Sequence, residues 1–213
     1  WTDSEMPLIS CEPRMVLDGL MFHSEEGDEK LVPAVWHGID EGRIDKVWMP
    51  AHECCSGRLA AADDEIVLDE HAASGMGIEV GDIVSIGAGH GSMEFTVVGI
   101  GYHPFHLYYA LEGSILPAEP GTFATGYLSD SGIERLANLS AGSANLLLLD
   151  VEGTPEFDLQ STEEVEGESL SQAISYVRQT VMDADDSSFT AYDRSGVDSV
   201  ELLRADAEGA SMS

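Results

Sequence analysis

Short apolar runs rich in β-branched residues, separated by polar or glycine-rich connections, dominate the first half of the chain. Residues 14–22 and 30–39 are two such runs, with a short acidic segment between them. Residues 80–86 and 93–100 are a second pair, joined by the glycine-rich segment 87–92. Paired runs of this length around a turn are typical of antiparallel hairpins. The sequence therefore predicts a mostly β first half.

Strands and helices alternate in the second half. Residues 122–128 are typical of a strand, and Ser129 or Asp130 can cap the helix that follows. Residues 145–151 form a continuous apolar run, which predicts a strand buried on both faces. Apolar residues then recur at helical spacing and predict a helix over residues 169–182, through Leu170, Ile174, Val177 and Val181.

These patterns predict an α+β fold with two parts. We expect a barrel-like, β-rich subdomain over residues 14–116 and a smaller α+β subdomain over residues 117–200. Residues 1–13 can contribute to the smaller part, and residues 201–213 form a tail. The boundary is placed at residues 117–120, where two prolines interrupt the chain.

The charge of the chain restricts its partners. Its 213 residues include 40 Asp and Glu against 9 Lys and Arg, which gives a formal net charge of −31. Such a field repels nucleic acids and anionic lipid headgroups, so nucleic-acid binding is excluded as a function. A high-salt habitat, in which dense carboxylates keep the surface hydrated, and an ordinary acidic surface both account for this composition.

The cysteines and the apolar runs also restrict the class of protein. With Cys54 and Cys55 adjacent, the three cysteines allow at most one disulfide, which would involve Cys11, and not the framework of a small secreted domain. No run approaches the roughly 18 apolar residues of a membrane helix. The chain opens at Trp1 without an initiator methionine, and we expect it to be a piece of a longer protein.

A longer motif spans residues 57–100. It contains a Gly-Arg pair at 57–58 and, after an acidic pair, Glu-Ile-Val-Leu at 65–68. A Val-Gly-Asp turn at 80–82 and Phe-Thr-Val-Val-Gly-Ile at 95–100 complete it. The turn has a structural reason, because glycine accepts unusual backbone angles and the aspartate side chain caps nearby amides.

This ordered set resembles the extracytoplasmic domain of MacB-like and FtsX-like ABC transporter permeases. The match continues in the same order through residues 121–129, 133–136 and 145–149. The resemblance implies a β-rich subdomain, called Sabre, inserted into an α+β subdomain, called Porter. Residues 14–116 would be Sabre-like and residues 117–200 Porter-like, although little precedes Arg14 that could supply the first Porter strand and helix.

The resemblance also implies a function. Such a domain is not an enzyme and holds no cofactor; it couples the ATP-driven motion of a separate cytoplasmic ABC ATPase to export or mechanotransmission outside the membrane. It lies on the extracytoplasmic side of the cell membrane and pairs with a second permease copy. An extracytoplasmic protein or a lipophilic substrate would be its partner outside the membrane. Consistent with a separate ATPase, the glycine-rich segment 87–92 lacks the lysine and the following helix of a phosphate-binding loop.

One cluster carries the residue types of a zinc site: His52, Glu53, Cys54 and Cys55. Adjacent cysteines rarely face a single point, and no second pair of ligands stands at finger-like spacing downstream. A loop with a disulfide or free thiols is therefore the favoured interpretation. A metal-dependent hydrolase that uses this cluster remains an alternative function.

A second set of residues is a candidate for contact with a partner or substrate, because loops that carry large aromatic side chains commonly form interfaces. The set lies in two irregular stretches and consists of Trp48, His103, Phe105, His106, Tyr108 and Tyr109. The competing interpretation is that these rings cover the open end of the β unit. A secreted or surface module that uses residues 102–109 to hold a ligand is a further alternative function.

Overall fold

The computed structural model describes residues 6–25, 28–39, 47, 56–89, 91–103, 119–154, 168–183, 190, 191 and 193. The chain divides into two compact units. Residues Pro13–Leu147 form the first, here called the barrel unit. Trp1–Glu12 and Leu148–Ser213 together form the second, here called the terminal unit.

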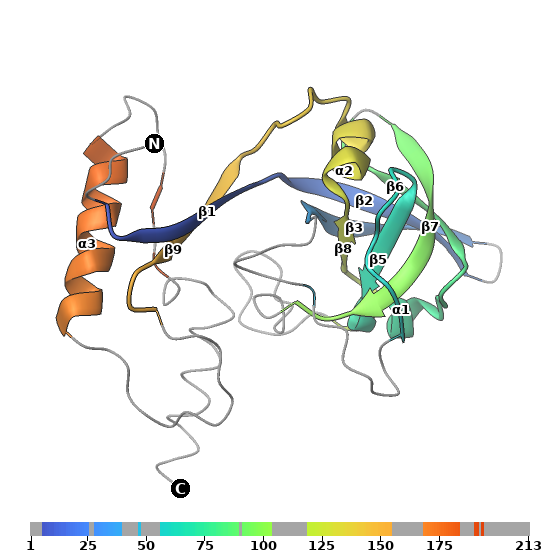
Figure 1. Ribbon diagram of the computed structural model, residues 1–213. Helices are drawn as coiled ribbons and strands as arrows, with labels where there is room; N and C mark the ends of the chain where they lie inside the picture. The colour runs from blue at the N-terminus through green and yellow to red at the C-terminus, as the bar shows by residue number, and fades with distance from the viewer. Residues whose placement is uncertain are drawn as a thin grey trace, which may run out of the picture. The chain divides into compact units, whose positions relative to one another are not determined.

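The strands of the barrel unit form one sheet in the order β4-β7-β5-β8-β3-β2-β6. Because β6 pairs with both β2 and β7, six of these strands close into a barrel (Figure 1). The two-residue strand β4 pairs with β7 outside the closure. The strands are β2 (Val16–Glu25), β3 (Asp28–Gly38), β4 (Ser56–Gly57), β5 (Glu65–Asp69), β6 (Ile83–Gly87), β7 (Ser92–Gly101) and β8 (Ala124–Leu128).

Two short helices belong to the barrel unit, α1 (Glu70–Met76) after β5 and α2 (Asp130–Ala137) after β8. Since β5 and β8 are antiparallel, the helices lie at opposite ends of the barrel (Figure 1). Each helix begins at a side-chain cap, because Asp69 accepts from the His71 amide and Ser129 from the Gly132 amide. Both end at a residue in the left-handed conformation.

The barrel consists of two halves with the same order of elements. In each, a hairpin is followed along the chain by a strand and a helix: β2, β3, β5 and α1, then β6, β7, β8 and α2, with the two-residue β4 added between β3 and β5 in the first half. The last strand of each half pairs in parallel with the hairpin of the other, β5 with β7 and β8 with β3. This exchange of strands closes the barrel, and its interior holds the main core.

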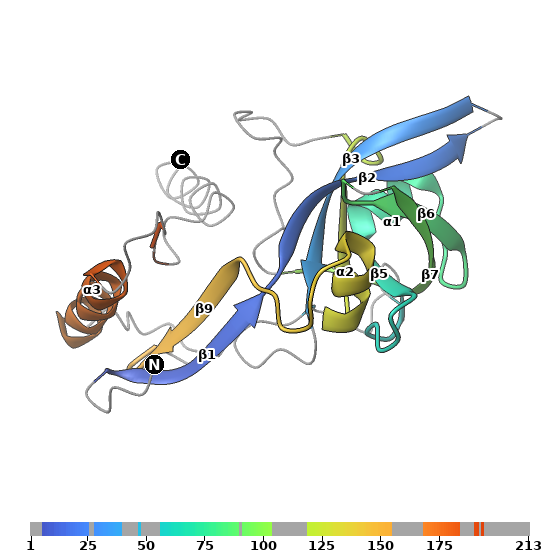
Figure 2. The same cartoon turned by 90° about the horizontal axis from the view of Figure 1, so that it is seen from above.

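The terminal unit contains α3 (Glu168–Asp183) and most of the two-stranded sheet formed by β1 (Leu8–Arg14) and β9 (Leu146–Val151). Figure 2 shows β1 and β9 side by side. The chain passes between the two units within these strands. None of the helices in the described part of the chain combines the length and the apolar character that a membrane span requires.

Most expected elements are present. The two predicted hairpins are β2–β3 and β6–β7, and the helix predicted over residues 169–182 is α3. β8 and α2, which the sequence analysis placed in a second subdomain from residue 117, lie in the barrel unit instead. The physical reason is that β8 is buried and hydrogen-bonded on both edges, to β3 and β5.

β9 differs from the expectation. It was predicted to be buried on both faces, but it pairs only with β1 among the described strands, and Leu147 is 45% exposed. An apolar run marks burial only where another layer covers it, and the sequence does not encode that layer locally. The sequence of residues 188–192 is also typical of a strand, but this segment lies mostly outside the described residues.

Candidate interaction site

A buried cluster lies on the outer face of the barrel, across β3, β8 and β5. His37 stands opposite Tyr127 in the register of β3 and β8, and Tyr127 stands opposite Val67 in that of β8 and β5. Side chains alternate along a strand, so these three face away from the interior that Trp36 and Leu128 fill. His37 is nevertheless only 7% exposed and Tyr127 2%, which means that further segments cover this outer face.

Two described residues belong to that cover. Val47 is buried in one cluster with Ile39, Val67 and Tyr127. His103, just beyond β7, stacks on Tyr127 with ring centroids 5.5 Å apart and on His37 at 6.4 Å. Val47, just before the first predicted stretch, and His103, in the second, therefore pack on the same part of the barrel.

Of the six predicted contact residues, His103 is the one that the structure describes. His103 is only 2% exposed, so its ring does not present a surface to a partner. This supports the covering role for His103 that the sequence analysis gave as the competing interpretation. Five other contact candidates lie outside the described residues: Trp48, Phe105, His106, Tyr108 and Tyr109.

The metal candidates His52, Glu53, Cys54 and Cys55 also lie outside the described residues. Within the described ranges, no three His, Cys, Asp or Glu side chains are grouped so that they could hold a metal ion. Cys11 is an exposed free thiol, so the single bridge that the sequence allowed for it is not formed.

A network of carboxylate and histidine side chains at the start of α1 includes Tyr102, which lies just beyond β7. Asp69 is fully buried, and its Oδ1 lies 3.4 Å from Nδ1 of His71. The Tyr102 hydroxyl donates to Oε2 of Glu70 at 3.2 Å, and its ring meets that of His71 edge-on. The Asp69 carboxylate, aided by Glu70, raises the pKa of His71.

The sequence analysis did not identify this network. Acidic residues are so abundant in the chain that Asp69 next to Glu70 carries almost no information. The missing signal is the parallel pairing of β5 with β7, which sets Asp69 opposite Gly101 and so brings Tyr102 near Glu70. The hydrogen bond from Tyr102 to Glu70 thus connects the end of β7 to α1, one residue before His103.

The motif at residues 57–100 consists largely of structural positions. Arg58 makes a two-pronged ion pair with Glu65, whose Oε2 also accepts from the Ala61 and Ala62 amides. The Arg58 guanidinium, followed by these amides, lowers the pKa of Glu65 to about 2. Gly57 has a φ of +87°, and a Cβ there would collide with the Val98 carbonyl oxygen.

The barrel unit also contains a cavity of about 40 Å³ near α2. This volume holds a few water molecules and is too small for an organic substrate. Its lining is Pro13, Arg14, Met15, Asp130, Ile133, Glu134, Gly142, Ser143 and Ala144. The outer-face cluster with Val47 and His103 is therefore the candidate interaction site, here called the loop face.

No family model and no curated protein matches the chain. The solved structures with a partial likeness to this chain include two permease-related domains. One is the extracellular domain of the noncanonical ABC-type transporter YknZ from Gram-positive bacteria, with a TM-score of 0.40 and 10% identity over 70% of this chain and 67% of that one. The other is a domain of a proposed permease from Porphyromonas gingivalis, with a TM-score of 0.40 and 12% identity over 93% of this chain and 85% of that one. Both are too distant to support a functional assignment, so the function proposed below rests on the chain's own residues.

Proposed function

We propose that this chain is an extracytoplasmic domain of a MacB-like or FtsX-like ABC transporter permease. In this role it couples the motion of a separate cytoplasmic ATPase to export or mechanotransmission, as one of two permease copies. The ordered motif at residues 57–100 supports the proposal, because Gly57, Arg58 and Glu65 each have a definite structural task. The insertion of the barrel unit between the two stretches of the terminal unit is the arrangement that the resemblance implies.

The observation that carries the proposal is the packing of Val47 and His103 around Tyr127. Val47 directly precedes Trp48 in the sequence, and His103 precedes Phe105 by two residues. Residues that follow two neighbouring points on a barrel can contribute to one contact surface. We assign the contact with an extracytoplasmic protein or lipophilic substrate to the side chains that follow these two points in the sequence, Trp48, Phe105, His106, Tyr108 and Tyr109.

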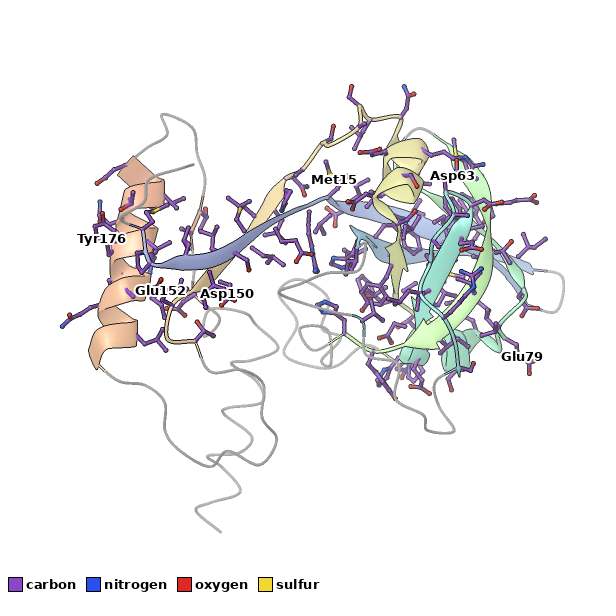
Figure 3. All side chains as sticks on the ribbon, in the orientation of Figure 1. Met15, Asp63, Glu79, Asp150, Glu152 and Tyr176 are labelled. Carbon is purple, nitrogen blue, oxygen red and sulfur yellow. The ribbon has the colours of Figure 1, made fainter. Side chains whose placement is uncertain are left out.

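The test uses the full permease with its ATPase. Replacing Phe105 and Tyr108 with alanine is expected to abolish the transport-linked function while ATP hydrolysis and expression persist. The control is Tyr176→Ala, which removes a 48% exposed aromatic ring from α3 (Figure 3) and should leave function unchanged. The melting temperature of the 213-residue chain is measured for each variant.

Two outcomes would contradict the proposal. If the double variant unfolds the isolated chain, the rings are core residues and the loop face is not an interface. If the full-length protein copurifies with no ABC ATPase while the chain alone binds a small ligand, the alternative of a surface ligand-binding module is correct.

A further inference from the structure

An exposed apolar surface lies on the outer side of the barrel, across β3, β2 and β6, away from β8 and β5 of the loop face. It comprises Leu20 and Phe22 on β2, Leu31 and Pro33 on β3, and Ile83 on β6. Leu31 is 58% exposed and Ile83 66%, while Leu20 and Phe22 are about 40% exposed. We call this surface the apolar sheet face.

The strand register makes the surface continuous. Phe22 stands directly opposite Leu31, and Leu20 directly opposite Pro33. On its other edge Phe22 stands opposite Ser85, two residues along β6 from Ile83. The alternate residues Met21 and Val32 are buried in the barrel interior, so the five apolar side chains point outward because of the pleat and not because the core is incomplete.

Among the side chains that the structure describes, the charges around this face are acidic, although the register also sets Lys30 opposite His23, one residue from Phe22. Asp18 is exposed two residues before Leu20 on β2, and exposed Glu94 stands opposite Ser85 on β7. Asp82 directly precedes Ile83, and Glu79 lies in the same connection (Figure 3). Among the arginines that the structure describes in the barrel unit, Arg14 is buried, Arg58 pairs with Glu65 and Arg135 lies beside Asp63. An apolar centre with an acidic border complements an apolar centre with a basic border.

The form of the sheet restricts the occupant further. Because β6 pairs with both β2 and β7, the β6 side of this surface offers no free strand edge to which a peptide strand could add. On the other side, β3 pairs with β8 only from Ala34 onward, and its stretch before Ala34 contains Pro33, which disfavours the addition of a strand there. Coverage through side chains is therefore favoured, and an amphipathic helix covers an apolar face in that way. A second copy of this chain would bring the same acidic border and a further charge of −31.

We propose that the apolar sheet face docks an amphipathic helix of a partner protein, with lysine or arginine residues on both sides of its apolar stripe. This inference does not rest on the proposed transporter function. A chain that binds no ATPase partner could still have this surface, and the two proposals fail in different experiments.

The test uses the 213-residue chain and synthetic helical peptides of about 18 residues. The probe has a leucine stripe flanked by lysines; one comparison peptide has glutamates in place of the lysines, and another keeps the lysines but has serines in place of the leucines. The variant is Phe22→Ser with Leu31→Ser. Its matched control is Leu139→Ser with Leu147→Ser, which removes two exposed leucines elsewhere in the barrel unit (37% and 45% exposed).

The wild type is expected to bind the leucine–lysine peptide in fluorescence anisotropy, and Phe22→Ser with Leu31→Ser to weaken that binding at least about tenfold. The control variant should bind as the wild type does, and the lysine–serine peptide should bind all three proteins with equal, weak affinity. Circular dichroism melts check that both variants are folded.

Three results would overturn the proposal. Equal binding of the leucine–lysine peptide by wild type and variant would mean that net charge alone attracts it. Preference for the leucine–glutamate peptide would refute the charge argument. A wild type that dimerises in analytical ultracentrifugation, with a monomeric Phe22→Ser, Leu31→Ser variant, would identify a second copy as the occupant.

Discussion

Trp36 occupies the barrel interior, and two glycines make room for its indole ring. The side chain is fully buried, and its Nε1 donates to the Gly87 carbonyl oxygen at 3.0 Å. A Cβ atom on Gly19 would collide with Nε1, and one on Gly126 would lie 2.8 Å from Cζ3. The barrel therefore depends on the absence of side chains at these two positions as well as on the ring itself.

We predict that Gly126→Ala lowers the free energy of unfolding by about 1–3 kcal/mol, because the new methyl group overpacks the core against Trp36 and Ile66. In a Trp36→Leu background, which lacks ring atoms Cε3 and Cζ3, the same substitution should cost clearly less. Urea unfolding of the four proteins in a double-mutant cycle measures this coupling. Strictly additive costs would show that the clash does not involve the indole.

The Arg58–Glu65 ion pair should account for part of the loss of folding stability at low pH. The folded pKa of Glu65 is about 2, below the value near 4.3 of an unfolded chain. Its stabilising contribution is therefore present above about pH 4.3 and is lost as the pH falls towards 2. We predict that Glu65→Gln lowers the unfolding free energy by about 1 kcal/mol at pH 7 and that the difference from wild type shrinks in that acid range.

The control for this prediction is Glu79→Gln, which removes one exposed carboxylate outside such a network. Urea titrations at successive pH values compare the three proteins. A gap between Glu65→Gln and wild type that stays constant down to pH values near 2 would contradict the assignment of the low pKa.

At the scale of the elements, Asn145 connects the start of β2 to the segment that enters β9. Its side-chain Oδ1 accepts from the Val16 amide at 2.8 Å, and its Nδ2 donates to the Val16 carbonyl oxygen at 2.7 Å. Its own amide donates to the Arg14 carbonyl oxygen at 2.9 Å. Asn145 thus ties the junction of β1 and β2 to the segment that enters β9, close to both points where the chain passes between the units.

We predict that Asn145→Ala lowers the unfolding free energy by about 1–2 kcal/mol, from the loss of two side-chain hydrogen bonds. It should also speed the hydrogen exchange of the Val16 amide, which mass spectrometry resolves in a peptide around residue 16. The control Ser143→Ala, in the same segment, removes only a local bond to Ser140 and should leave Val16 unchanged. Unaltered exchange at Val16 in the Asn145 variant would refute the tie.

For the whole molecule, the formal charge of −31 opposes the compact state through repulsion among carboxylates. Salt shortens the screening length from about 10 Å at 0.1 M to about 3 Å at 1 M. We predict that the melting temperature rises as NaCl increases from low to molar concentration. Sucrose at matched osmolality separates screening from solute exclusion, and a flat or falling curve in NaCl would contradict the high-salt interpretation of the composition.

The sequence alone determined the local elements of this protein. The two hairpins, the cap before α2, and the helix α3 follow from residue periodicity, glycine positions and capping side chains, which act over a few residues. The charge likewise follows from composition, because it is a sum over residues and needs no fold. The turn at residues 80–82 was also accessible, since Gly81 has a φ of +104° and Asp82 accepts from the Glu79 amide.

Only the tertiary structure decided which elements belong together. β8 and α2 lie in the barrel unit because β3 and β5, distant in sequence, pair with both edges of β8. The same long-range pairing covers Tyr127, buries His103 against it and turns Phe22 and Leu31 to the surface, although all four residues are equally aromatic or apolar in the sequence. Periodicity indicates which side chains share a face of an element. Whether that face is buried depends on what packs against it, and the closure of the barrel decides this.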